Sequence, residues 1–493
     1  MHETVAVVGA GTMGAGIAQV AALAGHPVVV LDAAPGAADR AIAGIRDQVT
    51  KLVARGKIDA DPDALDLTAA GSLEALAPAR IVIEAIVEDL AAKRSLFTDL
   101  ERVVAPGCVL ASNTSSLSPT AIAAGAARPE RILGLHFFNP VPRMRLVEVI
   151  AGSDTAPEVA DQAADLVTGW GKTVVRAAPT PGFIVNRVAR PFYAEAWRLL
   201  AEQAAPPETI DAVLTGAGGF PMGPFALMDL IGHDVNEAVT RSVWTAFGHD
   251  PRFEPSRAQR DLVEAGRLGR KTGRGTYHHG PDSRPAVAAA VPPRPAPPKA
   301  IDHSATDLRA LIARTGAPIV DGYHDTGTIE LPSGSVLVRS TGVSATELAG
   351  RHGVPVIVVD RALDDATATA IAIASSDGCP ADALHEATGL LQAAGLAVHV
   401  IDDAPGLIVT RTVAMLVNLA ADALYQGVAD AADIDTAMRL GANHPLGPLT
   451  WGDRWGADTV HTILTNLQHG YGDPRYRPSP LLRRRALSGG RFA

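Results

Sequence analysis

The sequence predicts an α/β domain followed by a helical domain, and then a degenerate second copy of the same pair. Three observations support this fold class. Over residues 1–178, short apolar runs alternate with helical patterns, which is typical of a mostly parallel sheet with helices on both faces. From residue 182 to about 270, apolar residues recur at a spacing of three to four, which indicates helices. Finally, the later part of the chain repeats motifs of the first part at a fixed distance.

The first α/β domain is expected to contain strands at Val5–Val8, Val28–Leu31, 80–84, Val109–Ser112, 132–136 and 146–150. A helix is expected from residue 182 to about 205, and Pro191 should bend it because proline removes a backbone donor and clashes with the preceding turn. In the second α/β region, strands are expected at 335–339, 354–359 and 397–401.

The repeat has an ungapped offset of 224 residues. The segment PGFIVNR at 181–187 matches PGLIVTR at 405–411, and PMGP at 221–224 matches PLGP at 445–448. Several further identities at the same offset make coincidence a poor explanation. Between the copies, residues 280–298 are rich in proline and alanine, which is typical of a semi-rigid linker. The expected domains are therefore 1–179, 180–279, a linker at 280–303, 304–402 and 403–493.

Composition limits the possible functions. The 493-residue chain has a formal net charge of −10, so it lacks the broad basic surface that general nucleic-acid binding requires. Its two cysteines, Cys108 and Cys379, lie far apart and indicate a reducing, cytoplasmic setting. Cys108 lies in an apolar run and is expected to be a small buried side chain. We expect no signal peptide, no membrane span and no metal site.

A glycine motif follows the first strand. It reads Gly9-Ala-Gly11-Thr12-Met13-Gly14, opens a helical pattern, and is followed by a second strand that ends at Asp32. This context of strand, glycines, helix, strand and acid is that of a Rossmann dinucleotide site. A carboxylate at Asp32 would bind ribose hydroxyls and repel a 2′-phosphate, which favours NAD over NADP. The alternative is a glycine-rich turn with a solvent-exposed aspartate.

Polar residues that could carry chemistry follow later strands. Asn113 and Ser115 come after the strand Val109–Ser112, and His136 ends another strand. Glu148 lies inside the apolar strand that follows, where a carboxylate needs a partner, and His136 is the nearest suitable one. A neutral histidine held by a carboxylate can take a hydroxyl proton as hydride leaves the same carbon. The alternative is a structural histidine–glutamate pair in the core.

Together these motifs resemble the L-3-hydroxyacyl-CoA dehydrogenase family. The resemblance rests on the glycine motif, NTSSL at 113–117, HFFNP at 136–140, LVEV at 146–149, PGFIVNR at 181–187 and GRLGRKTG at 266–273. It spans residues 4–279 almost continuously. The two-copy layout is similar to bacterial enzymes linked to phenylacetate degradation, which act as 3-hydroxyadipyl-CoA or 3-hydroxybutyryl-CoA dehydrogenases. The resemblance thus implies NAD-dependent oxidation of an (S)-3-hydroxyacyl-CoA in fatty acid metabolism and β-oxidation.

The resemblance also implies roles for single residues. His136 would be the general base and Glu148 its partner, while Ser115 and Asn186 would contact the substrate oxygen. Residues that would line the cofactor site or its nicotinamide end are Glu88, Lys93, Asn113, Ser115 and Asn139. Coenzyme A phosphates would be bound by Lys51, Arg55 and Lys57, although a solvated helix face explains these three equally well.

The second copy lacks these groups. At the offset of 224, His136 corresponds to Asp360, Glu148 to Ala372, Asn186 to Thr410 and Ser115 to Arg339, and no glycine motif occurs at 304–402. We therefore expect one active site per chain. Helical domains of this family pair between subunits, so the second helical domain is expected to pack on the first as an intramolecular pseudo-dimer, with or without a homodimer.

Two other functions remain possible at this stage. One is a β-hydroxyacid or sugar-acid dehydrogenase, and the other is a catalytically idle NAD-binding structural protein. Acyl chain length is not indicated by the motifs. Arg143 and Arg145, beside the catalytic turn, could bind the far carboxylate of a dicarboxylic acyl chain, or could simply be solvated surface arginines.

Overall fold

A computed structural model describes residues 3–281, 283–284, 286–303, 308–314, 316, 319–322 and 327–492. The chain divides into two compact units. The first contains residues 1–187 and 426–442, and the second contains residues 188–425 and 443–493. None of the helices in the described part of the chain is long and apolar enough to cross a membrane.

The first unit is built on a sheet with the strand order β3-β2-β1-β4-β5-β6-β7-β8. Neighbouring strands are parallel except β6 and β7, which are antiparallel. The strands are β1 (Val5–Val8), β2 (Val28–Leu31), β3 (Leu67–Ala70), β4 (Ile81–Glu84), β5 (Val109–Ser112), β6 (Ile132–Phe137), β7 (Leu146–Ala151) and β8 (Thr173–Ala177).

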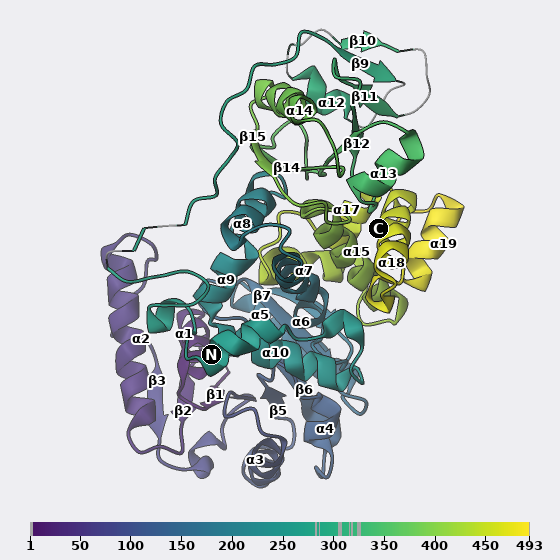
Figure 1. The fold of residues 1–493 in the computed structure, drawn as a ribbon. Helices are drawn as coiled ribbons and strands as arrows, with labels where there is room; N and C mark the ends of the chain where they lie inside the picture. Colours follow the sequence, from purple (N-terminus) through teal and green to yellow (C-terminus); the bar gives the residue numbers. More distant parts are fainter. Residues whose placement is uncertain are drawn as a thin grey trace. The chain divides into compact units, whose positions relative to one another are not determined.

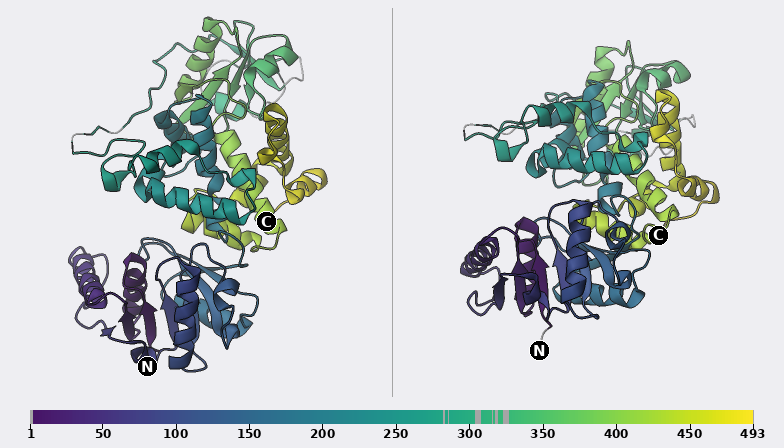
Figure 2. Two further views of the ribbon diagram at one scale, coloured as in Figure 1. Left: turned by 60° about the horizontal axis from the view of Figure 1, so that its bottom comes forward. Right: turned by 90° about the horizontal axis from the view of Figure 1, so that it is seen from below.

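Helices cover both faces of this sheet, as the alternation predicted (Figures 1 and 2). Side chains of β1 show why, because successive residues of a strand point to opposite faces. Val5 and Val7 pack with α1 (Thr12–Leu23), α2 (Ala37–Ala54) and α5 (Pro157–Gly169). Ala6 and Val8 pack with α3 (Leu90–Val103) and α4 (Pro119–Ala123) on the other face. Short 3-10 turns lie at η1 (Leu73–Leu76) and η2 (Pro129–Arg131).

The expected helix after residue 182 is divided at the predicted proline. α6 (Val185–Val188) ends just before Pro191, and α7 (Arg190–Ala201) begins with Pro191 in its first turn, where a proline needs no hydrogen-bond partner. In the second copy Met415 stands at the equivalent position, and α15 (Val409–Tyr425) is continuous. Pro191 is thus the local reason why the first copy has two helices where the second has one.

The second unit contains the rest of both helical regions. The first region supplies α7, α8 (Pro207–Gly216), α9 (Pro224–Ile231), α10 (His233–Ala246), η3 (Pro251–Phe253), α11 (Arg257–Glu264) and η4 (Arg270–Thr272). The second supplies α15, α17 (Pro448–Trp455), α18 (Ala457–Tyr471), η5 (Pro474–Tyr476) and α19 (Pro480–Ser488).

The two helical regions pack on each other through α7 and α15. The fully buried Arg411 of α15 donates to Glu195 of α7 at 3.0 Å and to Glu202, just after α7, at 2.8 Å. A buried guanidinium needs such partners, so this contact joins the copies firmly. The packing agrees with the expected arrangement of the second helical region against the first.

The second sheet has the strand order β10-β9-β11-β12-β13-β14-β15. Its strands are β9 (Ala300–His303), β10 (Ile319–Asp321), β11 (Thr328–Glu330), β12 (Val336–Arg339), β13 (Val356–Val359), β14 (Ala370–Ser375) and β15 (Ala397–Val400), and its helices are α12 (Arg309–Ala313), α13 (Ala345–His352) and α14 (Ala381–Ala393). β9 already belongs to this sheet, so the α/β region begins within the segment expected to be a linker. The predicted domain start at residue 304 lies outside the described residues.

Strands β12 to β15 repeat the pairing of β5 to β8, namely parallel, antiparallel and parallel. The offset of 224 holds from β13 onward. Upstream it is 226, because Leu110 pairs with Ile132 while Val336 pairs with Val356. The predicted match of Ser115 with Arg339 is therefore wrong. Arg339 corresponds to Asn113, and Ser115 corresponds to Thr341, because the connection before β13 is two residues shorter.

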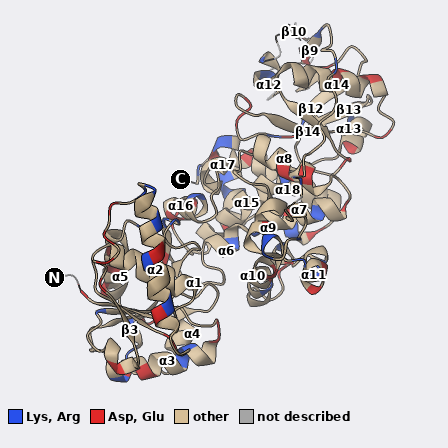
Figure 3. Cartoon of the chain, turned by 90° about the vertical axis from the view of Figure 1, so that its left-hand side faces the viewer, with Lys and Arg blue, Asp and Glu red and all other residues tan. Residues whose placement is uncertain are grey.

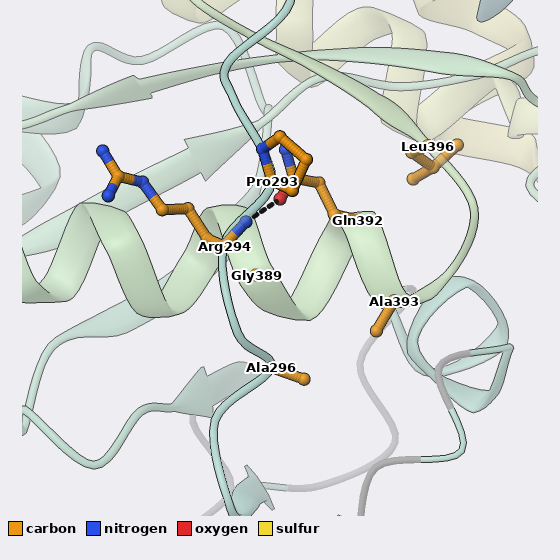
Figure 4. A pocket seen from close by; sticks show the side chains of 7 residues that line it. All are labelled: Pro293, Arg294, Ala296, Gly389, Gln392, Ala393 and Leu396. Atoms are coloured by element: carbon orange, nitrogen blue, oxygen red, sulfur yellow. Dashed lines mark hydrogen bonds between the residues drawn. The ribbon is translucent and has the colours of Figure 1, made fainter.

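Residues 293–296 of the proline-rich linker cross α14 in an extended conformation (Figure 4). Val291 N donates to Val398 O at 2.9 Å, and Arg294 N donates to the side-chain oxygen of Gln392 at 2.7 Å. The Gln392 side-chain nitrogen in turn donates to Val291 O at 2.8 Å. A shallow cavity of about 440 Å³ lies between these residues and the helix. The linker is thus attached to the second α/β region.

One helix of the second helical region falls in the first unit. Residues 426–442 contain α16 (Ala431–Gly441), which contacts β7 and β8. The expected domain 403–493 therefore does not form one compact body, because part of it packs against the first sheet. This contact lies beside the strand that carries Glu148.

Candidate active site

The glycine motif forms the turn between β1 and α1. Gly9 has a φ of +105°, and a side chain there would place its Cβ only 2.5 Å from Ala85 O. By contrast, no described atom lies within 4 Å of the Cβ position of Gly11. Gly9 is therefore needed for the turn, whereas Gly11 leaves an open approach to the backbone amides at the start of α1. Such amides bind phosphate groups well.

Asp32, just after β2, lies against this turn. Its Oδ2 accepts a hydrogen bond from Ala10 N at 2.6 Å, and its Oδ1 accepts one from Ala34 N at 2.8 Å. The neighbouring strands β1 and β2 bring the carboxylate there because their carboxyl ends meet at one edge of the sheet. The open backbone at Gly11 and the fixed carboxylate at Asp32 suit the pyrophosphate and ribose of NAD. Met13 packs against the apolar core.

His136 and Glu148 face each other across β6 and β7. The antiparallel register pairs the two residues directly, and His136 Nδ1 lies 2.6 Å from Glu148 Oε2. Glu148 is fully buried and His136 is 6% exposed. The other carboxylate oxygen, Oε1, accepts hydrogen bonds from Ile184 N at 3.0 Å and Val185 N at 3.1 Å. The predicted pair therefore forms, and Glu148 also binds the amides at the start of α6.

Asn186 follows these amides directly, so α6 brings it to the same end of the sheet as Glu148. Two aromatic rings enclose the histidine: the Phe138 ring centroid lies 4.4 Å from that of His136, and the Phe183 centroid lies 5.8 Å away. Because Nδ1 is bound to Glu148, Nε2 is the imidazole nitrogen left for a substrate. Neither Phe138 nor Phe183 was predicted as a site residue.

The loop after β5 is fixed by Asn113 and Glu88. Asn113 Oδ1 accepts from Phe137 N at 2.8 Å, which ties this loop to the residue after His136. Glu88 Oε1 accepts from the Thr114 hydroxyl at 2.7 Å, Ser115 N at 2.9 Å and Ser116 N at 3.0 Å. Burial raises the pKa of Glu88, but the Thr114 hydroxyl and the Lys93 charge outweigh it, so the net pKa is lowered. Glu88 therefore holds Ser115 in place as an anion.

Lys93 is fully buried beneath this loop. Its Nζ lies 2.6 Å from Glu84 Oε1 and 3.3 Å from Glu88 Oε2. Lys93 is thus buried beneath the residues that are predicted to line the cofactor site, and it supports Glu88 from there. Glu84, which also accepts from the Ser112 hydroxyl at 2.6 Å, was not predicted. The signal was a glutamate in an apolar strand, the kind of signal that identified Glu148, although Glu84 ends its strand and Glu148 lies inside its own.

Asn139 lies in the turn after β6 and is exposed. It lines a cavity of about 320 Å³ together with residues of α1 and α2, among them Thr12, Gly16 and Gln48. The buried Lys172 supports the rest of this turn by donating to Val141 O and to Met144 O at 2.9 Å. Burial lowers the pKa of Lys172 to about 8. Asn139 therefore shares this cavity with Thr12 of the glycine motif.

The basic residues assigned to coenzyme A lie on the surface. Lys51 on α2 forms an ion pair with Asp47 at 2.6 Å, one helical turn away, and charges of both signs alternate along α2 (Figure 3). Arg55 and Lys57 are exposed. For Lys51 this favours the solvated helix face. Arg143 and Arg145 are exposed too, and both line a groove of about 350 Å³ with Lys172.

The second copy uses different groups at the equivalent positions. Asp360, the counterpart of His136, is fully buried, and its Oδ2 accepts from Ile408 N at 3.0 Å and Val409 N at 2.7 Å. Its Oδ1 accepts from Thr410 N and from the Thr410 hydroxyl. Ala372 stands where the first copy has Glu148. At these equivalent positions the second copy thus keeps a carboxylate for the helix amides but has no histidine–carboxylate pair.

Comparison with known proteins agrees with this two-copy layout. Residues 4–180 match the family domain "3-hydroxyacyl-CoA dehydrogenase, NAD binding domain". Residues 182–279 and 406–491 both match "3-hydroxyacyl-CoA dehydrogenase, C-terminal domain". Between them, residues 337–405 match "3-hydroxybutyryl-CoA dehydrogenase reduced Rossmann-fold domain". The second α/β region is therefore a shortened Rossmann-like domain.

Relatives cover either the whole chain or its first copy. The 3-hydroxyadipyl-CoA dehydrogenase of Escherichia coli K12 is 46% identical over 98% of both chains. The mitochondrial hydroxyacyl-coenzyme A dehydrogenase of Rattus norvegicus is 40% identical over 56% of this chain and 90% of its own length. A crystal structure described as 3-hydroxybutyryl-CoA dehydrogenase from Escherichia coli K12 covers 99% of both chains with a TM-score of 0.91 and 45% identity.

Proposed function

This chain belongs to the 3-hydroxyacyl-CoA dehydrogenase family, an NAD-dependent group, and we propose that its His136–Glu148 pair oxidises the 3-hydroxyl of (S)-3-hydroxyacyl-CoA thioesters. The observation that supports this most directly is the 2.6 Å contact of the two side chains at the edge of the sheet where the dinucleotide turn lies. The family argues against a sugar-acid dehydrogenase. The intact pair argues against a catalytically idle protein.

The residues around the glycine turn would hold NAD. Gly11 leaves room for the pyrophosphate at the start of α1, and Asp32 would accept hydrogen bonds from the adenosine ribose. Thr12 and Asn139 would meet the cofactor in the cavity that they share. When bound, NAD supplies the acceptor for the hydride that leaves the carbinol carbon. The carboxylate of Asp32 would repel an additional 2′-phosphate, which favours NAD over NADP.

His136 would take the hydroxyl proton at Nε2. Glu148 accepts a hydrogen bond from the Nδ1–H of His136, which fixes the tautomer in which Nε2 is basic, and its charge stabilises the imidazolium that then forms. The two amides of α6 keep Glu148 in this orientation. Ser115, held by Glu88, and Asn186, on α6, would bind the substrate oxygen. His136 and Glu148 are thus both fixed by buried hydrogen bonds.

For the acyl chain, we propose hydroxyadipyl-CoA and hydroxybutyryl-CoA as the two candidate substrates. These are the substrates named for the full-length Escherichia coli relative and for the full-length Escherichia coli crystal structure. A dicarboxylic chain would need a cation for its far end, and Arg143 and Arg145 beside the catalytic turn could supply it. The pathway would be β-oxidation-like, as in phenylacetate degradation. We also propose a cytoplasmic location, because Cys108 and Cys379 are both free thiols.

The decisive experiment measures NADH formation from NAD with a panel of 3-hydroxyacyl-CoA thioesters. We expect turnover in the wild type and a loss of kcat of about 10²–10⁴-fold in His136→Ala, the usual contribution of a general base. His26→Gln is the matched control, since His26 lies in the same domain but contacts Glu3 O. Absence of turnover with every thioester, or full activity of His136→Ala, would contradict the proposal.

A second panel tests the acyl end. If Arg143 or Arg145 binds a far carboxylate, replacing it by alanine should raise KM for the hydroxyadipyl thioester and leave KM for the hydroxybutyryl thioester unchanged. Exposed charge pairs contribute little, so an effect of about 2- to 10-fold in KM is expected. If the ratio of the two KM values is unchanged in both variants, neither arginine binds the far carboxylate, and both are solvated surface residues.

A further inference from the structure

The segment of residues 426–442 belongs to the second copy in sequence but packs on the first sheet. Ala178 N, just after β8, donates to Val428 O at 2.7 Å, and Arg176 N of β8 donates to Asp433 Oδ2 at 2.8 Å. The buried Arg187, at the end of the segment that carries Asn186, donates to Gln426 Oε1 at 2.8 Å. These three bonds fix α16 beside β7 and β8.

Gly441, the last residue of α16, makes the closest approach. An added Cβ would lie 2.6 Å from Leu146 Cδ2 and 2.8 Å from Val185 Cγ2, both too short for a real contact, and 3.6 Å from Phe138 Cε1. Gly441 is not among the residues with positive φ. An alanine there would force the ends of the buried Leu146 and Val185 side chains to shift, so the packing and not the backbone conformation favours glycine.

Each of these three neighbours contacts or flanks the catalytic pair. Leu146 lies two residues before Glu148 on the same strand, so both side chains point to the same face. Val185 N donates to Glu148 Oε1. The Phe138 ring lies 4.4 Å from the His136 ring. A displacement at Gly441 would thus reach His136 and Glu148 from two sides.

We infer that Gly441 is a positioning residue for the His136–Glu148 pair, supplied to the active site of the first copy by the second. Its bare backbone lets α16 press against Leu146, Val185 and Phe138 and so fixes the ring and carboxylate at their contact distance. The inference rests on the proposed function only for its effect on rate. The second copy, which lacks such a pair at the equivalent positions, thus helps to position the catalytic pair of the first copy, in addition to packing on the first helical region.

The reciprocal contact offers a matched control. Gly216, the last residue of α8, approaches the second sheet in the same way, and its Cβ would lie 2.6 Å from Ala370 Cβ. Ala370 corresponds to Leu146 at the offset of 224. Ala204 O likewise accepts from Asp402 N at 2.9 Å, as Val428 O accepts from Ala178 N. Gly216→Ala therefore creates a clash at least as tight, because Ala370 Cβ cannot rotate away, beside a strand in which Ala372 replaces Glu148.

The test compares Gly441→Ala with Gly216→Ala in the full-length chain. For Gly441→Ala we expect kcat with the best thioester to fall by about 10- to 100-fold, since small displacements of catalytic groups are costly, with KM for NAD unchanged. Gly216→Ala should keep kcat within about twofold. Thermal unfolding of both variants monitors the shared packing cost. Equal losses of kcat in the two variants, or none in Gly441→Ala, would overturn the inference.

A spectroscopic experiment tests the positioning role of Gly441 without a measurement of activity. In protein with ¹⁵N-labelled histidine, the low-field Nδ1 proton of a short histidine–carboxylate hydrogen bond can be assigned to His136 by its loss in His136→Ala. We expect Gly441→Ala to shift or broaden this resonance and Gly216→Ala to leave it in place. An unchanged resonance in Gly441→Ala would overturn the positioning role even if no thioester were turned over. The proposed function and this inference can therefore fail separately.

Discussion

The two copies solve one structural problem with different residues. In each, a buried carboxylate binds the backbone amides at the start of a helix: Glu148 of β7 binds Ile184 N and Val185 N, and Asp360, just after β13, binds Ile408 N and Val409 N. In the first copy the second oxygen of Glu148 is left for His136. In the second, the remaining oxygen of Asp360 is used by Thr410.

This difference separates what the fold needs from what the chemistry needs. The fold needs an acceptor at the helix start, because orphan amides buried there would otherwise be costly. Catalysis needs the carboxylate on β7, one strand away from the position that corresponds to Asp360. A histidine at the end of β6 then lies between the carboxylate and the substrate. The first copy meets both needs with Glu148. The second copy keeps only the acceptor for the helix amides, and its residues 304–402 contain no glycine motif.

The largest effect should follow from removing the second copy. A chain that ends near residue 290 loses α15, which uncovers the face of α7 that packs on it and leaves the buried Glu195 without Arg411, and it loses α16 from the first sheet. We expect aggregation and loss of more than 99% of activity, on the order of the usual cost of misplaced catalytic groups. Size-exclusion chromatography and NADH formation measure both.

A cut chain is the control for this truncation. A protease site inserted at Val287, which is 81% exposed, would separate the copies covalently while both remain present. The cut protein should keep its activity, because the contacts of Arg411 and of residues 426–442 are noncovalent. If the truncated chain were a well-behaved, fully active protein, the second copy would have no role in the first site.

The next effect distinguishes the two carboxylates. Glu148→Gln should lower kcat by about 10²–10³-fold, because the amide cannot stabilise the imidazolium and one of its two ends must face wrongly, toward His136 or toward the α6 amides. Asp360→Asn should leave kcat unchanged but lower the free energy of unfolding by about 1–3 kcal/mol, since one buried donor loses its acceptor.

Steady-state kinetics and chemical denaturation of both variants measure this contrast. A large loss of kcat in Asp360→Asn would mean that the second copy takes part in catalysis through more than packing. An active Glu148→Gln would mean that the carboxylate serves the fold alone in both copies.

Much of the first copy could be predicted from local sequence. The glycine turn and the place of Asp32 follow from short-range patterns, and the pairing of His136 with Glu148 follows from two strands joined by a short turn. The break at Pro191 was predictable for the same reason. These features depend on residues close in sequence, where periodicity and turn chemistry are informative.

The rest depends on contacts that no local pattern indicates. The burial of Lys93 under its loop is set by Glu84 and Glu88 together, and the sequence shows only a lysine on a helix. The erroneous match of Ser115 with Arg339 arose because an ungapped offset cannot reveal a connection shortened by two residues. The approach of Gly441 to Leu146 joins positions almost 300 residues apart, and a lone glycine at a helix end usually indicates only a helix stop.

The smallest expected effect on activity concerns one pair of equivalent residues that contact each other. Phe220 and His444 correspond at the offset of 224, and their ring centroids lie 5.1 Å apart in an edge-to-face contact. His444 is buried, and among the described residues its Nδ1 has no hydrogen-bond partner. Burial lowers the pKa of His444 to about 3, because the charged imidazolium would lose its water there.

His444 should therefore weaken the fold in acid. Below the ordinary histidine pKa of about 6.5, the unfolded chain binds a proton that the folded chain does not, so stability falls with pH by up to about 1.4 kcal/mol per unit. His444→Phe should flatten the pH dependence of the free energy of unfolding between pH 6.5 and 4, and Phe220→His should steepen it. Denaturant unfolding at several pH values measures both slopes. If His444→Phe kept the wild-type slope, the acid sensitivity would come from other titratable groups, and replacing His444 by phenylalanine would not affect the pH dependence of stability.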